Sequence, residues 1–232
     1  MEKQKYAAIV LAAGSGKRMN SQVHKQYLII QDRPVLYYSL KEFQDSAVDE
    51  IVLVVGKGEE EFCRREIVDK YGISKVKAIV EGGKERYHSV FEGLKQTSDA
   101  DYVLIHDGAR PFVTEDIICR SIDTVKKEKA CVVGMPVKDT IKIATEDTYA
   151  SVTPDRRLVW MIQTPQAFSY PEILQAYEKI IADGDDSVTD DAMVLEHAAH
   201  MPVKLIEGSY HNIKITTPED MKIAEMFLKE YF

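Results

Sequence analysis

Short apolar runs alternate along the chain with segments in which helical spacing or charge predominates. Each run is nearly all apolar, which is typical of a strand buried on both faces of a sheet. The expected strands are 7–13, 50–55, 76–83, 101–111 and 130–137. Helices are expected between them, at 34–44, about 58–70, 85–96 and 114–128. Pro34 occupies a favoured first-turn position, and Thr114 is expected to open the last of these helices.

This alternation of strand and helix predicts an α/β fold. Strand–helix repeats form right-handed crossovers, so the strands are expected to lie mostly parallel, with helices on both faces of the sheet. Ligands of such sheets bind at the carboxyl ends of the strands. Three expected strands run there into polar or glycine-rich segments, namely Gly14–Arg18, Gly82–Arg86 and His106–Arg110. We therefore expect a binding site where these three segments meet.

The alternation of strands and helices ends after Pro136. The segment 138–166, KDTIKIATEDTYASVTPDRRLVWMIQTPQ, alternates strand-like stretches with polar turns, which predicts a β-hairpin arm inserted at about 138–160. An isolated hairpin is marginally stable and has unpaired edges. Docking of the arm onto a second subunit would cover those edges, whereas a surface excursion without a partner is the alternative.

Length and composition restrict the class of protein. The 232 residues, 45% of them hydrophobic, fit one large domain or two small ones, and we expect a single domain over 1–232. The net charge of −8 argues against a general nucleic-acid binder but allows a local cationic pocket. No run approaches the roughly 18 apolar residues of a membrane span, and the N-terminus lacks the pattern of a signal peptide. Cys63, Cys119 and Cys131 are scattered, as reduced thiols of a cytoplasmic protein are.

The first expected strand leads into LAAGSGKRM, residues 11–19. Two glycines followed by Lys17 and Arg18 combine a closely approaching backbone with positive charge, and phosphate binding needs both. The segment is not a Walker A loop, because Arg18 stands where Ser or Thr is required. It is not a Rossmann dinucleotide loop, because Met19 replaces the third glycine. A plain strand–helix connection is the alternative interpretation.

Eight segments, in order along the chain, resemble those of one enzyme family, the 2-C-methyl-D-erythritol 4-phosphate cytidylyltransferases. They are LAAGSGKRM, KQY, GGKERYHSV, HDGARPF, PVKDTIK, TPDRRLVWMIQTPQAF, TDDAMVLE and NIKITTPED, and the resemblance extends from about residue 6 to residue 228. It implies a Rossmann-like three-layer nucleotidyltransferase fold and the transfer of CMP from CTP to 2-C-methyl-D-erythritol 4-phosphate. The products would be 4-diphosphocytidyl-2-C-methyl-D-erythritol and pyrophosphate.

Ribitol-5-phosphate cytidylyltransferases are similar in sequence and form the first alternative. They typically carry AGG, DAVRP and SDA where this chain has AAG at 12–14, DGARP at 107–111 and TDD at 189–191. They also lack the Asp155-Arg156 pair. These four differences favour methylerythritol phosphate as the acceptor. A non-catalytic nucleotide-binding regulator of the same fold is the second alternative, but the cations that such a protein would lose are all present.

The resemblance also implies roles for individual residues. The catalytic cations would be Arg18, Lys25 and Lys214, and Asp107 would hold a Mg²⁺ ion. The nucleotide would contact Ala12, Ala13, Gly14, Gly82, Gly83 and Ser89. The acceptor would contact Arg110, Thr140, Arg156 and Thr189, with Arg156 reaching from the arm into the neighbouring subunit's site in a homodimer. Lys84 departs from the family pattern, because many relatives carry an acidic residue there.

No general base is expected for this reaction. The acceptor phosphate is already an anion near neutral pH, so the main barrier is to bring two anions together and to stabilise charge on the leaving pyrophosphate. Positioning and preorganised cations are expected to supply most of the rate. His106 is therefore expected to be structural, and Asp190 and Asp191 are expected to shape their loop or cap a helix at 192–199.

Overall fold

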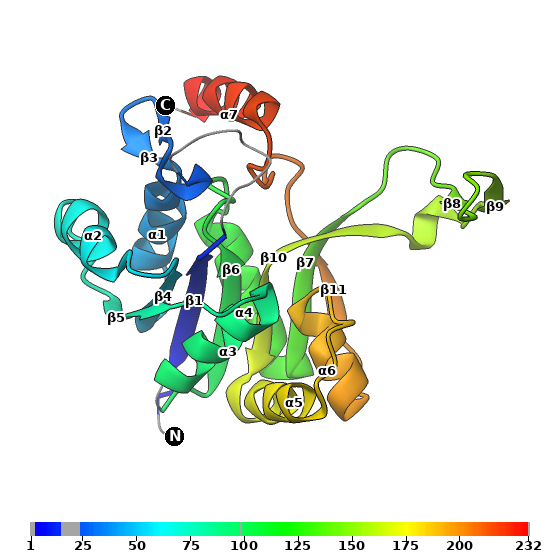
Figure 1. Ribbon diagram of the computed structural model, residues 1–232, viewed down its shortest axis with the longest axis horizontal. Coiled ribbons are helices and arrows are strands. Elements are labelled where there is room, and N and C mark those ends of the chain that lie inside the picture. Colours follow the sequence, from blue (N-terminus) through cyan, green and yellow to red (C-terminus); the bar gives the residue numbers. More distant parts are fainter. Residues whose placement is uncertain (1–2, 15–23, 98, 232) are drawn as a thin grey trace.

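A seven-stranded sheet runs through the computed structural model, which describes residues 3–14, 24–97 and 99–231 (Figure 1). The strand order is β11–β7–β10–β6–β1–β4–β5. β10 is antiparallel to both of its neighbours, and the other pairs are parallel. The strands are β1 (Tyr6–Ala12), β4 (Glu50–Val55), β5 (Val76–Glu81), β6 (Tyr102–Asp107), β7 (Ala130–Pro136), β10 (Trp160–Ser169) and β11 (Lys204–Glu207). The expected α/β fold with a mostly parallel sheet is confirmed.

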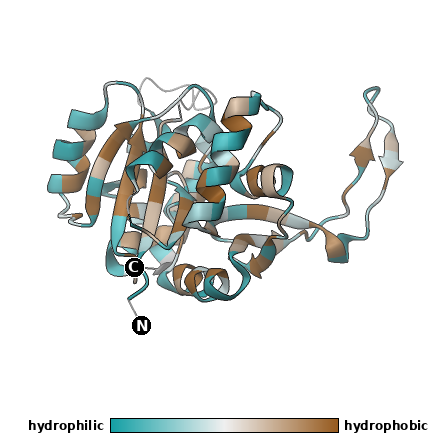
Figure 2. Ribbon diagram, turned by 90° about the horizontal axis from the view of Figure 1, so that it is seen from below, coloured by the Kyte–Doolittle hydropathy of each residue, from teal (hydrophilic) through white to brown (hydrophobic). Residues whose placement is uncertain are grey.

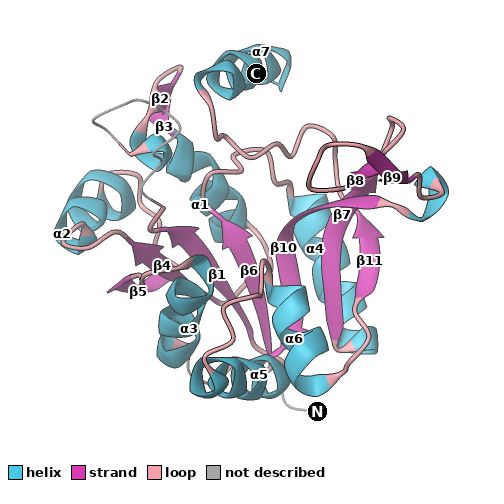
Figure 3. Cartoon of the chain, turned by 45° about the vertical axis from the view of Figure 1, so that its right-hand side comes forward, coloured by secondary structure: helices cyan, strands magenta, loops and turns pink. Residues whose placement is uncertain are grey.

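Helices form a layer on each face of this sheet, which makes three layers in all (Figure 3). Alternate residues of β1 serve the two faces, since Ala8 and Val10 pack in one core cluster and Ile9 packs in the other. The first layer contains α1 (Val35–Asp45), α2 (Glu60–Cys63), the π-helical turn η3 (Arg64–Asp69) and α4 (Glu115–Glu128). The second contains α3 (Arg86–Gln96), α5 (Tyr170–Asp183) and α6 (Asp191–Ala199).

A third, smaller cluster lies beyond the main sheet. The C-terminal helix α7 (Pro218–Tyr231) packs Ala224 and Leu228 against Ile30 and Phe112. Ile30 belongs to a two-stranded hairpin, which consists of β2 (Ile29–Ile30) and β3 (Arg33–Pro34). The α7 helix thereby holds the segment that follows the first glycine-rich loop.

The register of the parallel strands brings their carboxyl ends to one edge. Ala12 of β1 lies opposite Val55 of β4, and Leu11 lies opposite Asp107 of β6. Val55 in turn lies opposite Glu81 of β5. The carboxyl ends of β1, β5 and β6, whose following segments the sequence predicts to meet, therefore lie at this edge together with that of β4.

The expected elements before residue 137 are present, with small differences at their ends. Strands 76–83 and 101–111 end earlier than expected, at Glu81 and Asp107, because their glycine and polar tails form the loops of the edge. The expected helix at 58–70 is a short α-helix that continues as a π-helical turn. Pro34 precedes α1 as its N-cap rather than lying in its first turn. Thr114 caps α4 as expected, since its side chain accepts a hydrogen bond from the Ile117 N–H.

A hairpin arm projects from the body of the molecule (Figures 1 and 2). It consists of β8 (Ile143–Ala144), β9 (Ala150–Val152) and the 3₁₀ turn η4 (Arg156–Leu158). β10 begins at Trp160, where the arm expected at about 138–160 ends, and it inserts antiparallel between β6 and β7.

Two further features bear on the class of protein. Within the described ranges, no helix combines the length and the apolar character that a membrane-crossing segment needs. All three cysteines are unpaired, and the thiols of Cys63 and Cys131 are buried. Burial raises the pKa of Cys63 to about 11 and that of Cys131 to about 12, so both stay protonated and unreactive at neutral pH.

Candidate active site

A pocket of about 220 Å³ opens at the carboxyl ends of β1, β5 and β6. It is lined by Leu11, Ala12, Ala13, Gly14, Lys25, Gln26, Lys84, Arg86, Ser89, Asp107, Ala109 and Lys214. Seven of these are residues that the sequence analysis assigns to the nucleotide, the metal or catalysis. A larger hollow of about 530 Å³ lies between α1, α7 and residues 111–114, but none of the predicted site residues lines it. The smaller pocket is therefore the candidate active site.

Small residues form one wall of the pocket. A Cβ atom on Gly82 would lie 2.5 Å from the Ala13 Cβ and 2.7 Å from the Ser89 Oγ, so only glycine fits there. The Gly83 N–H donates to the Ser89 Oγ at 3.1 Å, which fixes the hydroxyl at the pocket wall. Among the described residues, none has an atom within 4 Å of the Cβ position of Gly14, apart from its chain neighbour. This wall leaves room for a flat group against exposed backbone.

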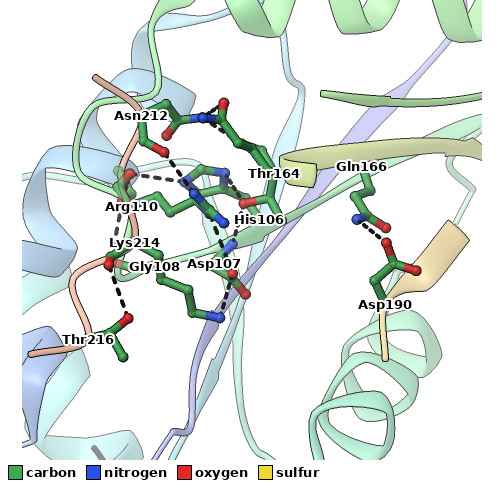
Figure 4. A network of polar contacts seen from close by, with 12 residues as sticks. His106, Asp107, Gly108, Arg110, Thr164, Gln166, Asp190, Asn212, Lys214 and Thr216 are labelled. Atoms are coloured by element: carbon green, nitrogen blue, oxygen red, sulfur yellow. Dashed lines mark hydrogen bonds and ion pairs between the residues drawn. The ribbon is translucent and has the colours of Figure 1, made fainter. Parts of the chain in front are cut away.

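Asp107 lies at the centre of a group of cations (Figure 4). Its Oδ2 is 2.8 Å from the Lys214 Nζ and 3.6 Å from the Arg110 Nε, and its Oδ1 is 3.5 Å from the Arg86 Nε. Burial alone would raise the pKa of this carboxyl, but Arg86, Lys214 and Arg110 together hold it well below its usual range. Asp107 therefore stays ionised at any working pH, and the pocket keeps an excess of positive charge around it.

His106 supports the Asp107 turn without facing the pocket. The Thr164 hydroxyl accepts a hydrogen bond from the Asp107 N–H at 3.0 Å. The Arg110 carbonyl can only accept, so the His106 Nε2 donates to it at 3.2 Å, and in the neutral ring Nδ1 accepts from the Thr164 hydroxyl at 3.0 Å. Burial lowers the pKa of His106 to about 4, so the ring is neutral at physiological pH. These contacts agree with the structural role that the sequence analysis gives to His106.

The loop that carries Lys214 is tied to the same turn. The Arg110 guanidinium donates to the Asn212 carbonyl at 2.7 Å, and the Asn212 side-chain amide donates to the Thr164 carbonyl at 2.9 Å (Figure 4). Asn212 is fully buried, and burial also lowers the pKa of Arg110. Lys214 therefore reaches Asp107 from a loop that is anchored at two points.

Arg86 is a pocket residue to which the sequence analysis gives no role. Its two terminal nitrogens pair with both oxygens of Asp191 at 2.7 Å each, and Tyr177 donates to the same carboxylate at 2.5 Å. Although burial opposes it, the charges of Asp191 and Asp107 raise the pKa of Arg86. A cation in the first turn of a helix is unfavourable, because it faces the positive end of the helix dipole. This position in α3 is the sequence signal that could have identified Arg86.

The pair Asp190 and Asp191 behaves as the sequence analysis expects. Asp190 caps α6, since its Oδ1 accepts from the Met193 N–H at 2.9 Å. The Gln166 amide group donates to the Asp190 Oδ2 at 3.0 Å, and its oxygen accepts from the N–H groups of Asp191 and Ala192 at 3.0 Å (Figure 4). Gln166 therefore joins β10 to the start of α6. Its contact with the Asp191 N–H fixes the backbone of the residue that pairs with Arg86.

The remaining predicted residues lie elsewhere. Arg18 falls outside the described residues. Thr140 and Arg156 lie on the arm, where the Arg156 guanidinium donates to the Lys138 carbonyl at 3.3 Å. Thr189 is exposed beside Asp190. Neither the arm residues nor Thr189 line the pocket of their own chain, and the predicted contacts Gly82, Gly83 and Arg110 do not line it either.

Known proteins resemble the chain over nearly its whole length. The family model of 2-C-methyl-D-erythritol 4-phosphate cytidylyltransferase matches residues 6–230. The enzyme of that name from Lachnoclostridium phytofermentans is 50% identical over 228 residues, which is 98% of each chain. Its counterpart from Lachnospira eligens is 53% identical over 224 residues, 96% of this chain and 98% of that one.

Solved structures agree with these sequence relatives. The 4-diphosphocytidyl-2C-methyl-D-erythritol synthase of Anaerococcus prevotii has a TM-score of 0.86 and 38% identity, over 97% of this chain and 96% of that chain. The 2-C-methyl-D-erythritol 4-phosphate cytidylyltransferase of Thermus thermophilus has a TM-score of 0.77 and 28% identity, over 95% and 98% of the two chains. The fold is thus that of the nucleotidyltransferases that the sequence motifs resemble.

Proposed function

The chain belongs to the 2-C-methyl-D-erythritol 4-phosphate cytidylyltransferase family, and from this membership we propose that the pocket at the ends of β1, β5 and β6 binds CTP for the reaction. The protein is a nucleotidyltransferase that transfers CMP from CTP to 2-C-methyl-D-erythritol 4-phosphate. The observation that supports the site is the meeting of Lys25, Lys214 and Asp107 with the small-residue wall of Ala12–Gly14.

The wall is suited to a cytosine base. The backbone at Gly82 and Gly83 packs against Ala13 and Ser89 of the pocket, and we propose that it supplies a carbonyl acceptor for the amino group, with the Ser89 hydroxyl as a second polar contact. Uracil has no amino group and would leave such an acceptor without a partner, which is how a pocket discriminates against it. Lys84 lines the same pocket, so a side chain of opposite charge to that of many relatives adjoins the nucleotide.

Replacing Ser89 tests this assignment. We expect Ser89→Ala to lower kcat/KM for CTP roughly tenfold to a hundredfold, because both the base and the Gly83 N–H lose a partner. The ratio of kcat/KM for CTP to that for UTP is expected to fall as well. Pyrophosphate release with each nucleotide measures both quantities. An unchanged ratio and an unchanged kcat/KM would place the base elsewhere.

The phosphate chemistry follows from the charges at the pocket. An oxygen of the acceptor phosphate attacks the α-phosphorus of CTP, the new P–O bond forms, and the bond to the β-phosphate oxygen breaks. Lys25 and Lys214 line the pocket, and they are proposed, together with Arg18, to stabilise charge on the α-phosphate and the leaving pyrophosphate. No proton has to be removed from the attacking phosphate, so the reaction requires no general base.

The residues present fit a Mg²⁺ ion that is bound partly by substrate. In the described part of the chain, no group of three or more His, Cys, Asp or Glu side chains could hold a metal by itself. One carboxylate, phosphate oxygens and waters form a normal Mg²⁺ site, and Asp107 supplies an ionised carboxylate at the pocket. When bound there, Mg²⁺ would neutralise charge on the CTP phosphates.

We further propose that the arm completes the acceptor site of a second subunit in a homodimer. Tyr149 is 75% exposed and Leu158 81% exposed, and Ile143 and Val152 are also more than half exposed. A two-stranded hairpin with apolar side chains in water needs a partner surface to be stable. Arg156 and Thr140 would then contact the acceptor that is bound in the partner subunit, alongside Arg110 and Thr189 of that subunit.

The three unpaired cysteines support a cytoplasmic location.

Mixed dimers test the shared site. A heterodimer of one Arg156→Ala subunit and one Lys214→Ala subunit holds one intact site, made of Lys214 from one chain and Arg156 from the other. We expect the purified heterodimer to regain about half of the wild-type kcat, although each parent homodimer is nearly inactive. Arg157→Ala is the control, because Arg157 pairs with Asp155 on the arm itself. A heterodimer no more active than its parents would show that Arg156 serves its own chain or no site.

A further inference from the structure

We propose that Glu59 is a positioning residue that holds Lys25 in place for the transfer of CMP. The proposal rests on the proposed function, in which Lys25 contacts the CTP phosphates. Lys25 opens η2, a 3₁₀ turn of three residues, Lys25–Tyr27. Such a turn has poor hydrogen-bond geometry and little stability of its own, so its position depends on what its side chains contact.

One carboxylate contacts a residue on each side of Lys25. The Tyr27 hydroxyl donates to the Glu59 Oε2 at 2.8 Å. The His24 Nδ1 lies 2.7 Å from the other oxygen, Oε1, a close contact without hydrogen-bond geometry. Glu59 therefore contacts the residue before the turn and the residue that ends it, and Lys25 lies between these two contacts.

Glu59 is itself held firmly enough to act as an anchor. It lies in the loop that follows β4, where the Gly56 N–H donates to its Oε2 at 3.0 Å. Its own N–H donates to the Gly56 carbonyl at 3.1 Å. A Cβ atom on Gly56 would lie 2.6 Å from the Glu59 Oε2, so glycine is required for the carboxylate to fold over the loop. The Glu59 side chain is only 20% exposed.

The tyrosine contact is also fixed from its other side. The Tyr27 hydroxyl lies 3.0 Å from the Cys63 Sγ, and the Phe62 ring packs edge-on against the Tyr27 ring with centroids 5.1 Å apart. Burial and the neighbouring Cys63 and Glu59 raise the pKa of Tyr27, so its hydroxyl remains a hydrogen-bond donor. The turn is therefore connected to the end of β4 and the start of the helix that follows it.

A second anchor joins the turn to the nucleotide loop. The Gln26 amide donates to the Ala12 carbonyl, and the Gln26 side chain is 1% exposed. Gln26 and Tyr27 thus bind protein groups outside the turn, and Lys25 and Gln26 line the pocket. Gln26 sets the distance to the β1 loop, and Glu59 sets the orientation of the turn around Lys25. Without Glu59, the lysine is still present but is no longer preorganised for the transition state.

The expected effect is on turnover more than on CTP binding. A lysine that acts mainly in the transition state loses kcat when its position is relaxed, whereas KM changes less. We expect Glu59→Ala to lower kcat roughly tenfold, with KM for CTP changed by less than about threefold. Glu59→Gln keeps an oxygen that can accept from Tyr27 and Gly56, and we expect it to restore kcat to within roughly threefold of wild type. Tyr27→Phe removes one of the two contacts of Glu59, and its kcat is expected to lie between those of Glu59→Ala and Glu59→Gln.

A double-mutant cycle with Lys25→Met is the test. If Glu59 acts through Lys25, adding Glu59→Ala to Lys25→Met leaves kcat at the value of Lys25→Met alone. The control is Glu61→Ala, since Glu61 is exposed on α2, and it is expected to keep the wild-type kcat and KM. Melting midpoints are compared for all variants. If Glu59→Ala fails to fold, the cycle is run with Tyr27→Phe in its place.

The failures of the two proposals are distinguishable. Full turnover by Lys25→Met would show that Lys25 has no catalytic role, and the positioning role of Glu59 would fall with it. Suppose instead that Lys25→Met is slow, and that adding Glu59→Ala lowers kcat further by the same factor as in the wild-type background. That result would overturn the positioning role of Glu59 alone. An equal loss in Glu59→Ala and Glu59→Gln, without rescue, would also contradict it.

Discussion

Replacing Lys214 by alanine is expected to lower kcat about 10²–10³-fold while the protein stays folded. The Lys214 side chain is 37% exposed at the pocket, and its ammonium lies 2.8 Å from the Asp107 Oδ2. Its loop is anchored through Asn212 to both Arg110 and Thr164, so the charge is in place before substrate binds. A preorganised cation at a developing phosphate charge acts mainly in the transition state, and kcat should therefore change more than KM for CTP.

Lys222→Ala is the matched control for this experiment. Lys222 is an exposed residue of α7, and we expect its replacement to leave kcat unchanged. Steady-state pyrophosphate release and a melting midpoint for each variant supply the comparison. A Lys214→Ala protein with wild-type kcat would remove Lys214 from the transition state and reduce it to a partner of Asp107.

Asp107→Asn is expected to reduce kcat/KM by at least about 10²-fold and to raise the Mg²⁺ concentration that gives half-maximal rate. The carboxylate is the acidic group of the pocket, and its low pKa means that it is charged whenever the enzyme works. An asparagine keeps the size of the side chain but loses the anionic oxygen that a hard cation prefers. It also leaves Lys214 and Arg110 without the carboxylate that they now contact.

The dependence on Mg²⁺ separates a metal role from a general loss of charge balance. Asp123→Asn, at an exposed position of α4, is the control and should show the wild-type Mg²⁺ dependence. If Asp107→Asn were slow but reached half-maximal rate at the wild-type Mg²⁺ concentration, Asp107 would organise the cations without binding the metal.

The local patterns of the sequence predict the parallel half of the fold well. Apolar runs such as Glu50–Val55 are short and bounded by glycine or polar residues, so they are readily identified as buried strands. The strand Trp160–Ser169 was harder to predict, because Gln163 and Thr164 interrupt it and its register shifts between Ile162 and Gln166. Its antiparallel place between β6 and β7 is a tertiary choice that local spacing does not encode.

The site, too, has residues that local sequence identifies and residues that only tertiary packing reveals. Lys25, Asp107 and Lys214 lie in recognisable sequence motifs, and the structure brings all three to one pocket. Arg86 and Asp191 are 105 positions apart, and their bidentate pair depends on the packing of α3, α5 and α6 rather than on any local motif. Glu59 is one of three consecutive glutamates, and only the fold distinguishes it from its exposed neighbour Glu61.

The most direct test of the central claim is pyrophosphate release by the wild-type protein with CTP and Mg²⁺, in parallel assays with 2-C-methyl-D-erythritol 4-phosphate and with ribitol 5-phosphate. The account predicts rapid release with the methylerythritol phosphate and little with ribitol phosphate. Release with ribitol phosphate alone would contradict the assigned acceptor while keeping the fold and the phosphate chemistry. A folded protein that released pyrophosphate with neither acceptor would contradict the catalytic role of the pocket.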